Sequence, residues 1–155
     1  MASKPSSGRR HNCAIPYICT KGAEGAIEFY KKAFGAVEIG KRYPWEGKVG
    51  HAEVRIEGAL VMLADEFPDY HRSPTTLGGT PFSIHIEVRD VDKIFNRAVD
   101  AGAKVLQQPK DEEYGRICKL RDPFGHEWMF NAVPQKRPTG ILKRNPVKRK
   151  ARKSR

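Results

Sequence analysis

The sequence contains an internal repeat with a spacing of about 67 residues, and this repeat restricts the folds that are open to the chain. Gly58 and Gly125 each lie between two strand-like runs, and they are 67 positions apart. Gly35 and Gly102 each follow a helical pattern, and they are also 67 positions apart. Two copies are too few for a solenoid, so the repeat predicts a duplicated module.

Each copy shows the same order of elements: strand, helix, strand, strand, strand. In the first copy, an extended run at 14–20 leads into a helical pattern at 23–34, whose apolar residues share one face. Residues 50–57 then alternate between apolar and polar, as half-buried strands do. The second copy repeats the extended run at 82–88 and the helix at 92–100. The pattern therefore predicts an α+β fold made of two βαβββ modules.

Charge separates the C-terminal segment from the rest of the chain. Residues 136–155 contain ten Lys or Arg and no acid, whereas the remaining residues have 19 basic and 18 acidic side chains. Such a segment cannot bury enough apolar surface to offset its ordering entropy, so we expect it to be disordered. The predicted organisation is a flexible arm (1–12), one domain (13–134) of two modules (13–66 and 81–134) with a linker (67–80), and a basic tail (135–155).

Three interpretations of the basic tail remain open. Its cationic side chains suit the phosphates of nucleic acids, which are bound through counterion release without sequence specificity. The run is also similar to a nuclear-import signal, which applies if the cell has a nucleus. The third interpretation is a solvated tail that maintains solubility. Nucleic-acid binding or targeting would be carried by Lys143, Arg144, Lys148, Arg149, Lys150, Arg152 and Lys153.

The cysteines and the hydropathy indicate a cytoplasmic protein. Cys13, Cys19 and Cys118 are an odd number without metal-binding spacing, and residues 1–12 lack the apolar segment of a secretory signal. Reduced thiols in the cytoplasm are therefore expected. No apolar run approaches the roughly 20 residues that a membrane-spanning helix requires.

Four segments in the order and spacing of the repeat resemble one known family. They are AIEFYKKAFGA, GHAEVRIEGALVMLAD, SIHIEVRDVDKIFNRAVDAGAKV and YGRICKLRDPFGHEW. Together they resemble the glyoxalase/bleomycin-resistance (vicinal oxygen chelate) superfamily, and within it the PhnB-like branch. The resemblance implies that the two modules form curved, mixed sheets around a shared cleft. It also implies a homodimer, because members of this superfamily usually dimerise and some do so by exchanging modules.

The resemblance also locates the superfamily's usual metal site. Metal-dependent members supply one ligand from the first strand and one from the last strand of each half. By position, these four slots hold Ile15, Met62, Ser83 and Met129. None is a good ligand for a divalent ion that prefers imidazole or carboxylate groups. We therefore expect no metal cofactor at these slots.

Strand alternation suggests which side chains would line the cleft instead. Residues two positions apart on a strand share a face, so polar residues that alternate with core residues should point into the cavity. A small polar-aromatic or cationic ligand would suit such a lining, although the same pattern also fits a solvated sheet face. The expected ligand-binding residues are Tyr17, His51, Glu53, Arg55, Met62, His85, Glu87, Glu127 and Met129.

Several other side chains have a predicted role or position. A displaced divalent-metal site would use His51, Glu53, His85 and Glu87. His126 is expected near the surface. Tryptophans at 45 and 128 are expected in the core or at a subunit interface, and no nucleophile is convincing.

Three functional hypotheses follow from these residues and from the resemblance. The first is a metal-free protein that binds a small molecule in the cleft without changing it. The second is a lyase, isomerase or dioxygenase of the same superfamily with displaced metal ligands. The third is a nucleic-acid-associated protein in which the tail supplies the affinity.

Overall fold

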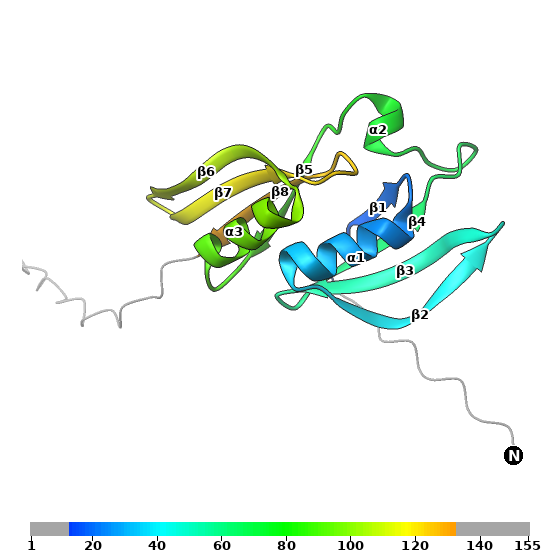
Figure 1. Cartoon of the computed structure of the whole chain (residues 1–155), viewed down its shortest axis with the longest axis horizontal. Helices are drawn as coiled ribbons and strands as arrows, with labels where there is room; N and C mark the ends of the chain where they lie inside the picture. Colours follow the sequence, from blue (N-terminus) through cyan, green and yellow to red (C-terminus); the bar gives the residue numbers. More distant parts are fainter. Residues whose placement is uncertain (1–12, 133–155) are drawn as a thin grey trace, which may run out of the picture.

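The computed structural model describes residues 13–132, which form two copies of the predicted βαβββ module (Figure 1). The short helix α2 lies between the copies, within the predicted linker. The predicted arm at 1–12 and the basic tail fall outside the described residues. The elements are β1 (Tyr17–Thr20), α1 (Ala23–Phe34), β2 (Val37–Trp45), β3 (Lys48–Ile56), β4 (Ala59–Asp65), α2 (Pro74–Leu77), β5 (Ser83–Glu87), α3 (Val91–Ala101), β6 (Lys104–Glu112), β7 (Gly115–Arg121) and β8 (Glu127–Ala132).

Each module contributes one four-stranded mixed sheet. The strand orders are β1-β4-β3-β2 and β5-β8-β7-β6, and the first pair in each sheet is parallel while the others are antiparallel. This arrangement confirms the predicted fold. Within residues 13–132, no helix is both long and apolar enough to cross a membrane.

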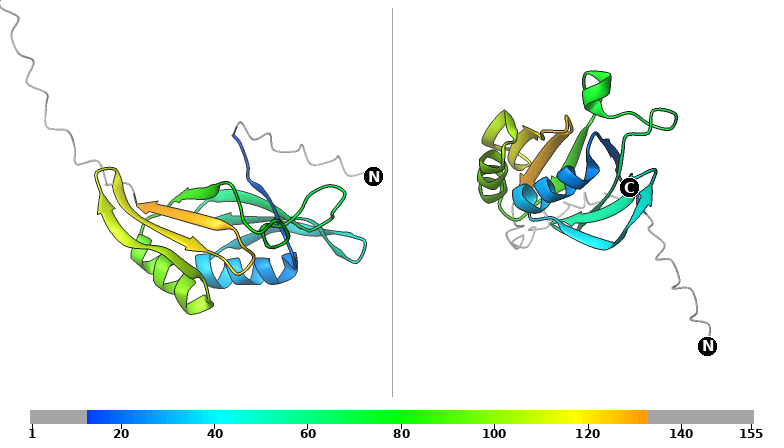
Figure 2. Two further views of the ribbon diagram at one scale, coloured as in Figure 1. Left: turned by 90° about the horizontal axis from the view of Figure 1, so that it is seen from above. Right: turned by 45° about the vertical axis from the view of Figure 1, so that its right-hand side comes forward.

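Helices α1 and α3 pack against each other and cover the same side of the two sheets (Figure 2). Apolar residues from α1, such as Ile27 and Phe34, share one core with Trp128 and Phe130 of the second module. The opposite side of each sheet is not covered by a helix, and we call it the open face. The polar residues of the alternating strands lie on this face.

Buried Asp65 fixes the beginning of α1. Its Oδ1 accepts hydrogen bonds from the backbone N–H groups of Gly22 and Ala23, at 3.0 and 2.8 Å. Its Oδ2 accepts one from the N–H of Val49 at 2.8 Å. A helix N-terminus has N–H groups without helical partners, and here a carboxylate from β4 satisfies them. The first helix is thereby attached to its own sheet.

A second buried carboxylate, Asp122, joins the two modules. Its Oδ2 accepts the hydroxyl of Tyr30 at 2.7 Å and the indole N–H of Trp128 at 2.9 Å. Its Oδ1 accepts the N–H groups of Phe124 and His126, at 2.9 and 3.0 Å. Tyr30 belongs to the first module and the other residues belong to the second.

The surface position expected for His126 is wrong. Only 5% of this residue is exposed, and its Nε2 bonds the carbonyl oxygen of Cys19 at 2.8 Å. The tight turn between β7 and β8 bends the chain back against β1, and this long-range contact has no signal in the local sequence. Trp128 is fully buried, which confirms its predicted core position.

Candidate functional site

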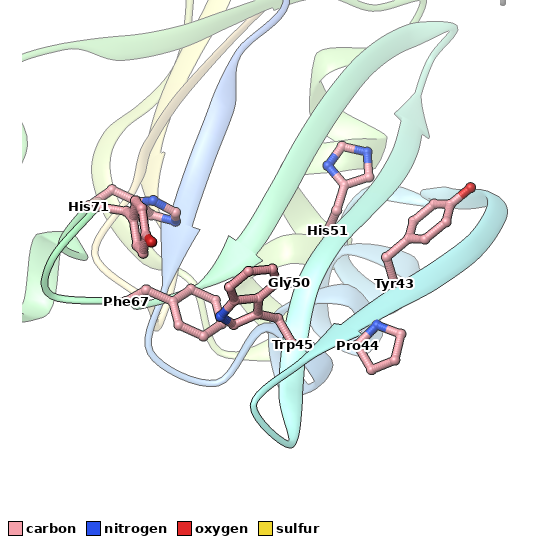
Figure 3. Close-up of a pocket in the computed structure, with 8 residues that line it drawn as sticks. Tyr43, Pro44, Trp45, Gly50, His51, Phe67 and His71 are labelled. Atoms are coloured by element: carbon pink, nitrogen blue, oxygen red, sulfur yellow. The ribbon is translucent and has the colours of Figure 1, made fainter.

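A groove with a volume of about 430 Å³ lies at one end of the first module. Figure 3 shows its side chains on the β2–β3 hairpin and on the loop that follows β4. We call it the aromatic groove. It is lined by Tyr43, Pro44, Trp45, Gly50, His51, Phe67, Tyr70 and His71.

The aromatic side chains of the β2–β3 hairpin reach the groove from a strand, β2, that pairs irregularly with β3. The register between β2 and β3 shifts between Ile39 and Tyr43, and again between Tyr43 and Pro44. Proline is tolerated there because β2 is an edge strand. A Cβ atom added at Gly50 would lie 2.6 Å from the Cβ of Trp45, so glycine is needed for Trp45 to take this position.

The other wall is formed by the first part of the predicted linker. Phe67 pairs with His71 in an isolated bridge, and its carbonyl accepts the N–H groups of Tyr70 and His71. The carboxylate of Glu66 accepts hydrogen bonds from Ser73 and Thr76. The hydroxyl of Thr76, followed by the contacts of Ser73, holds the pKa of Glu66 below its usual value. These hydrogen bonds to Glu66 therefore hold the two ends of the loop that forms this wall.

A chain of polar contacts runs from the groove along the open face. His51 Nδ1 lies 3.3 Å from the hydroxyl of Tyr17, and His51 Nε2 lies 3.3 Å from a carboxylate oxygen of Glu53. The rings of Tyr17 and His51 are stacked, with centroids 5.6 Å apart. Burial raises the pKa of Tyr17, with a smaller contribution from Cys19, which keeps its hydroxyl protonated as a donor. Tyr17 also donates to the carbonyl of Gly50.

Two properties of the groove indicate a binding surface. Tyr43, Trp45 and Tyr70 are 64%, 54% and 78% exposed, although large aromatic residues usually contribute to cores. His71 Nε2 is buried and has no hydrogen-bond partner within residues 13–132. Buried polar atoms usually have a hydrogen-bond partner, so this nitrogen distinguishes the His71 wall of the groove from most of the protein interior.

The structure brings four of the predicted site residues together. Tyr17, His51 and Glu53 form the polar chain beside the groove, and Met62 pairs with both Tyr17 and Glu53 on neighbouring strands. These four residues belong to β1, β3 and β4 and share the open face of the first sheet.

The other predicted site residues lie elsewhere. Arg55 and His85 line a separate groove of about 370 Å³ between the modules. Glu87, Glu127 and Met129 belong to β5 and β8 of the second sheet, where Glu127 is paired with Arg121 at 2.6 Å. The aromatic groove itself contains only His51 of the nine residues.

Sequence reasoning missed most of the aromatic groove. Strand alternation does not predict which side chains of β2 share a face, because the register shifts interrupt the strand's period of two. Trp45 is half-exposed, so of the two positions predicted for it the core is wrong, while the subunit interface stays a prediction. The available signal was the close spacing of Tyr43, Pro44 and Trp45 in an otherwise polar segment.

The residues at the superfamily's metal slots do not fit a divalent ion. Ile15 precedes β1, and the residue opposite Met62 is Tyr17. In the second sheet His85 lies opposite Met129, while Ser83 lies opposite Glu127. Thioether and phenol groups are poor ligands for zinc, manganese or magnesium, and the good donors beside them, His85 and Glu127, do not form part of a cluster of three within residues 13–132.

The four residues of the expected displaced metal site are divided between two strands of different sheets, β3 and β5. Across positions 13–132, no group of three or more His, Cys, Asp or Glu side chains is arranged to hold a metal ion.

Comparison with known proteins identifies the family. The model of the Glyoxalase/Bleomycin resistance protein/Dioxygenase superfamily matches residues 11–130, and the chain belongs to this family. The uncharacterized protein Rv0887c of Mycobacterium tuberculosis is 46% identical over 118 residues, which cover 73% of this chain and 69% of that protein. The family predicted from the four sequence segments is confirmed.

Solved structures share the fold. TioX from Micromonospora sp. ML1 has a TM-score of 0.63 and 27% identity, covering 80% of this chain and 98% of that one. TnmS3, described as an antibiotic binding protein from Streptomyces sp. CB03234, has a TM-score of 0.58 and 21% identity, covering 81% and 100%. A PhnB protein from Bacillus cereus has a TM-score of 0.54 and 18% identity, covering 77% and 98%. At these last two identities the likeness concerns the fold alone.

Proposed function

We propose that this protein binds a planar aromatic small molecule in the aromatic groove, without a divalent metal ion and without transforming it. The observation that carries this proposal is the group of exposed aromatic side chains around a cavity of about 430 Å³. This volume falls within the range of small-molecule sites, which are mostly apolar with a few well-placed polar groups.

The chemistry of the lining favours flat, conjugated ligands. Stacking on a side chain such as Trp45 contributes roughly 0.5–1.5 kcal/mol per aromatic pair beyond simple burial. On the wall of the groove, the ring of His51, whose Nδ1 lies 3.3 Å from the hydroxyl of Tyr17, would orient a carbonyl, hydroxyl or ring nitrogen of the ligand. The proposal therefore specifies an aromatic body with one polar edge.

Binding without turnover is favoured over catalysis by two observations. The donor set at the metal slots does not suit a Lewis-acidic ion, as described above. In addition, burial, followed by the charges of Glu66 and Asp65, raises the pKa of Cys19 to about 12, so this thiol is not an activated nucleophile. The fold shared with TnmS3, an antibiotic binding protein, is consistent with sequestration.

A homodimer and a cytoplasmic location remain part of the proposal. Exposed apolar side chains outside the groove, including Val37 and Leu106 on the edge strands β2 and β6, provide surface for a second copy. Light scattering at micromolar concentration is expected to give twice the chain mass of 17.5 kDa. A mass of one chain would contradict the dimer, and cell fractionation tests the location.

The two tryptophans provide a direct test of ligand binding. Trp45 lies in the groove and is 54% exposed, whereas Trp128 is fully buried in the core. We expect acridine, a flat three-ring probe whose absorption overlaps tryptophan emission, to quench Trp45 saturably with a micromolar Kd. The conservative variant Trp45→Phe should lose the quenching signal while keeping a Kd close to wild type, measured by acridine fluorescence anisotropy.

Metal dependence is tested in the same titration. Treatment with EDTA should leave the Kd for acridine unchanged, and elemental analysis should find no near-stoichiometric metal. Loss of acridine binding after EDTA treatment, restored by added zinc or manganese, would contradict the proposal that binding needs no metal. Acridine binding to both Trp45→Ala and wild type with equal Kd would instead refute the location of the site.

A further inference from the structure

The aromatic groove contains a histidine whose two ring nitrogens both have partners. His51 Nδ1 lies 3.3 Å from the hydroxyl oxygen of Tyr17, and His51 Nε2 lies 3.3 Å from a carboxylate oxygen of Glu53. The Tyr17 hydroxyl also lies 3.2 Å from the carbonyl oxygen of Gly50, which is a second acceptor for its proton. His51 lines the groove (Figure 3), so a change in its charge acts directly on a ligand there.

This arrangement offers a complete set of hydrogen bonds to both protonation states of His51. An ionised carboxylate can only accept, so Glu53 places the proton of a neutral imidazole on Nε2 and leaves Nδ1 to accept the Tyr17 hydroxyl. When His51 is protonated, Nδ1 becomes a donor to the hydroxyl oxygen, and the hydroxyl turns its hydrogen to the Gly50 carbonyl. The charge can therefore change without a movement of heavy atoms.

The groups that face His51 come from four parts of the chain. Tyr17 on β1 stacks on its ring at 5.6 Å, and the ring of Tyr43 on β2 lies 6.1 Å away. His71, in the loop after β4, meets Tyr17 edge-on at 6.0 Å. Glu53, on β3 like His51, is the carboxylate within hydrogen-bond distance. With His51 neutral, the His51–Glu53 pair carries one negative charge, and protonation of His51 cancels that charge.

The rings of the groove suit a positively charged ligand. Among the described residues that line it, none is a lysine, arginine, aspartate or glutamate. The faces of aromatic rings carry partial negative charge and attract cations. One lining ring already has such a contact, because the ammonium of Lys48 lies 5.5 Å from the centre of Phe67. A lysine keeps its charge where histidine titrates, so Lys48 adds no pH dependence.

We propose that His51 makes the groove selective for aromatic cations, which bind while His51 is neutral and are released when it is protonated. This inference rests on the proposed binding of an aromatic molecule. Histidine changes charge between about pH 5 and pH 8, so cation binding is tightest above this range and weakens as the pH falls. By linkage, a bound cation favours neutral His51 and expels its proton.

Two three-ring probes of similar shape separate charge from stacking. 10-Methylacridinium is a permanent cation and 10-methylacridone is neutral. The Kd of 10-methylacridinium for the full chain, measured by fluorescence anisotropy, should rise about tenfold from pH 8 to about pH 5.5. A larger change is not expected, because the side chains of His51 and Glu53 are 28% and 29% exposed and solvent screens them. The Kd of 10-methylacridone should not change.

Replacement of the histidine tests whether it is the titrating group. His51→Gln cannot be protonated, so its Kd for 10-methylacridinium should be the same at both pH values. His85→Gln removes a histidine outside the aromatic groove and should keep the tenfold change. Calorimetry in two buffers of different ionisation enthalpy should show proton release when the cation binds to wild type and none with His51→Gln. Circular dichroism checks that both variants are folded.

Three results would overturn the inference. In the first, His51→Gln keeps the pH dependence of wild type. In the second, His71→Gln loses that dependence while His51→Gln keeps it, which assigns the effect to the other histidine of the groove. In the third, both probes bind with Kd values that are independent of pH. Failure of both probes to bind at either pH would instead contradict the proposed function itself, and the inference with it.

Discussion

Replacement of Asp122 by alanine is expected to lower the free energy of unfolding by about 4 kcal/mol, because four donors lose their acceptor in a buried site. Two of these donors, the Tyr30 hydroxyl and the Trp128 indole N–H, come from different modules. The other two are the N–H groups of Phe124 and His126, which shape the turn before β8. Thermal unfolding followed by circular dichroism should show a Tm that is lower by roughly 12 °C.

Two further variants test why Asp122 matters. Tyr30→Phe removes only the bond between the modules and should cost about 1–2 kcal/mol. Asp111→Ala removes an exposed carboxylate and should change stability by less than about 0.5 kcal/mol. If Asp122→Ala were as stable as Asp111→Ala, the carboxylate would not be the junction of the two modules.

The second large effect concerns the groove, and it depends on the proposed function. Trp45→Ala is expected to weaken acridine binding at least 100-fold, which corresponds to about 2.7 kcal/mol. The substitution removes a wall of the groove, whereas the exposed position of Trp45 means that little core packing is lost. Anisotropy of acridine fluorescence measures the Kd without relying on tryptophan emission.

The control for this variant is an exposed aromatic residue outside the groove. Tyr114 is 59% exposed, close to the value for Trp45, and lies in the turn between β6 and β7. Tyr114→Ala should leave the Kd unchanged. Gly50→Ala should weaken binding without removing any aromatic ring, because its Cβ would displace Trp45. Equal losses for Trp45→Ala and Tyr114→Ala would indicate nonspecific adsorption.

The sequence predicted the architecture because the repeat and the alternation are local patterns. Ala52, Val54 and Ile56 are buried as their period of two requires, and the helical face at 23–34 packs into the core. Gly35 and Gly102 end their helices with positive φ, as expected for αL caps.

The aromatic groove was not predicted from the sequence, for physical reasons that can be named. The polar face of β3 placed His51 and Glu53 correctly together, but the register shifts in β2 and the path of the loop at 67–71 have no periodic signature. A groove made by two irregular segments from different parts of the chain depends on tertiary contacts. His126 became buried for the same reason, through its long-range bond to Cys19.

The most direct test of the central claim is a crystal structure of the metal-stripped protein with acridine bound. We expect density for the ring system in the aromatic groove, in contact with Trp45 and with a polar atom near His51, and no metal density. Acridine in the groove between the modules beside Arg55 and His85, or a metal ion on the open faces at Met62 or Met129, would contradict the claim.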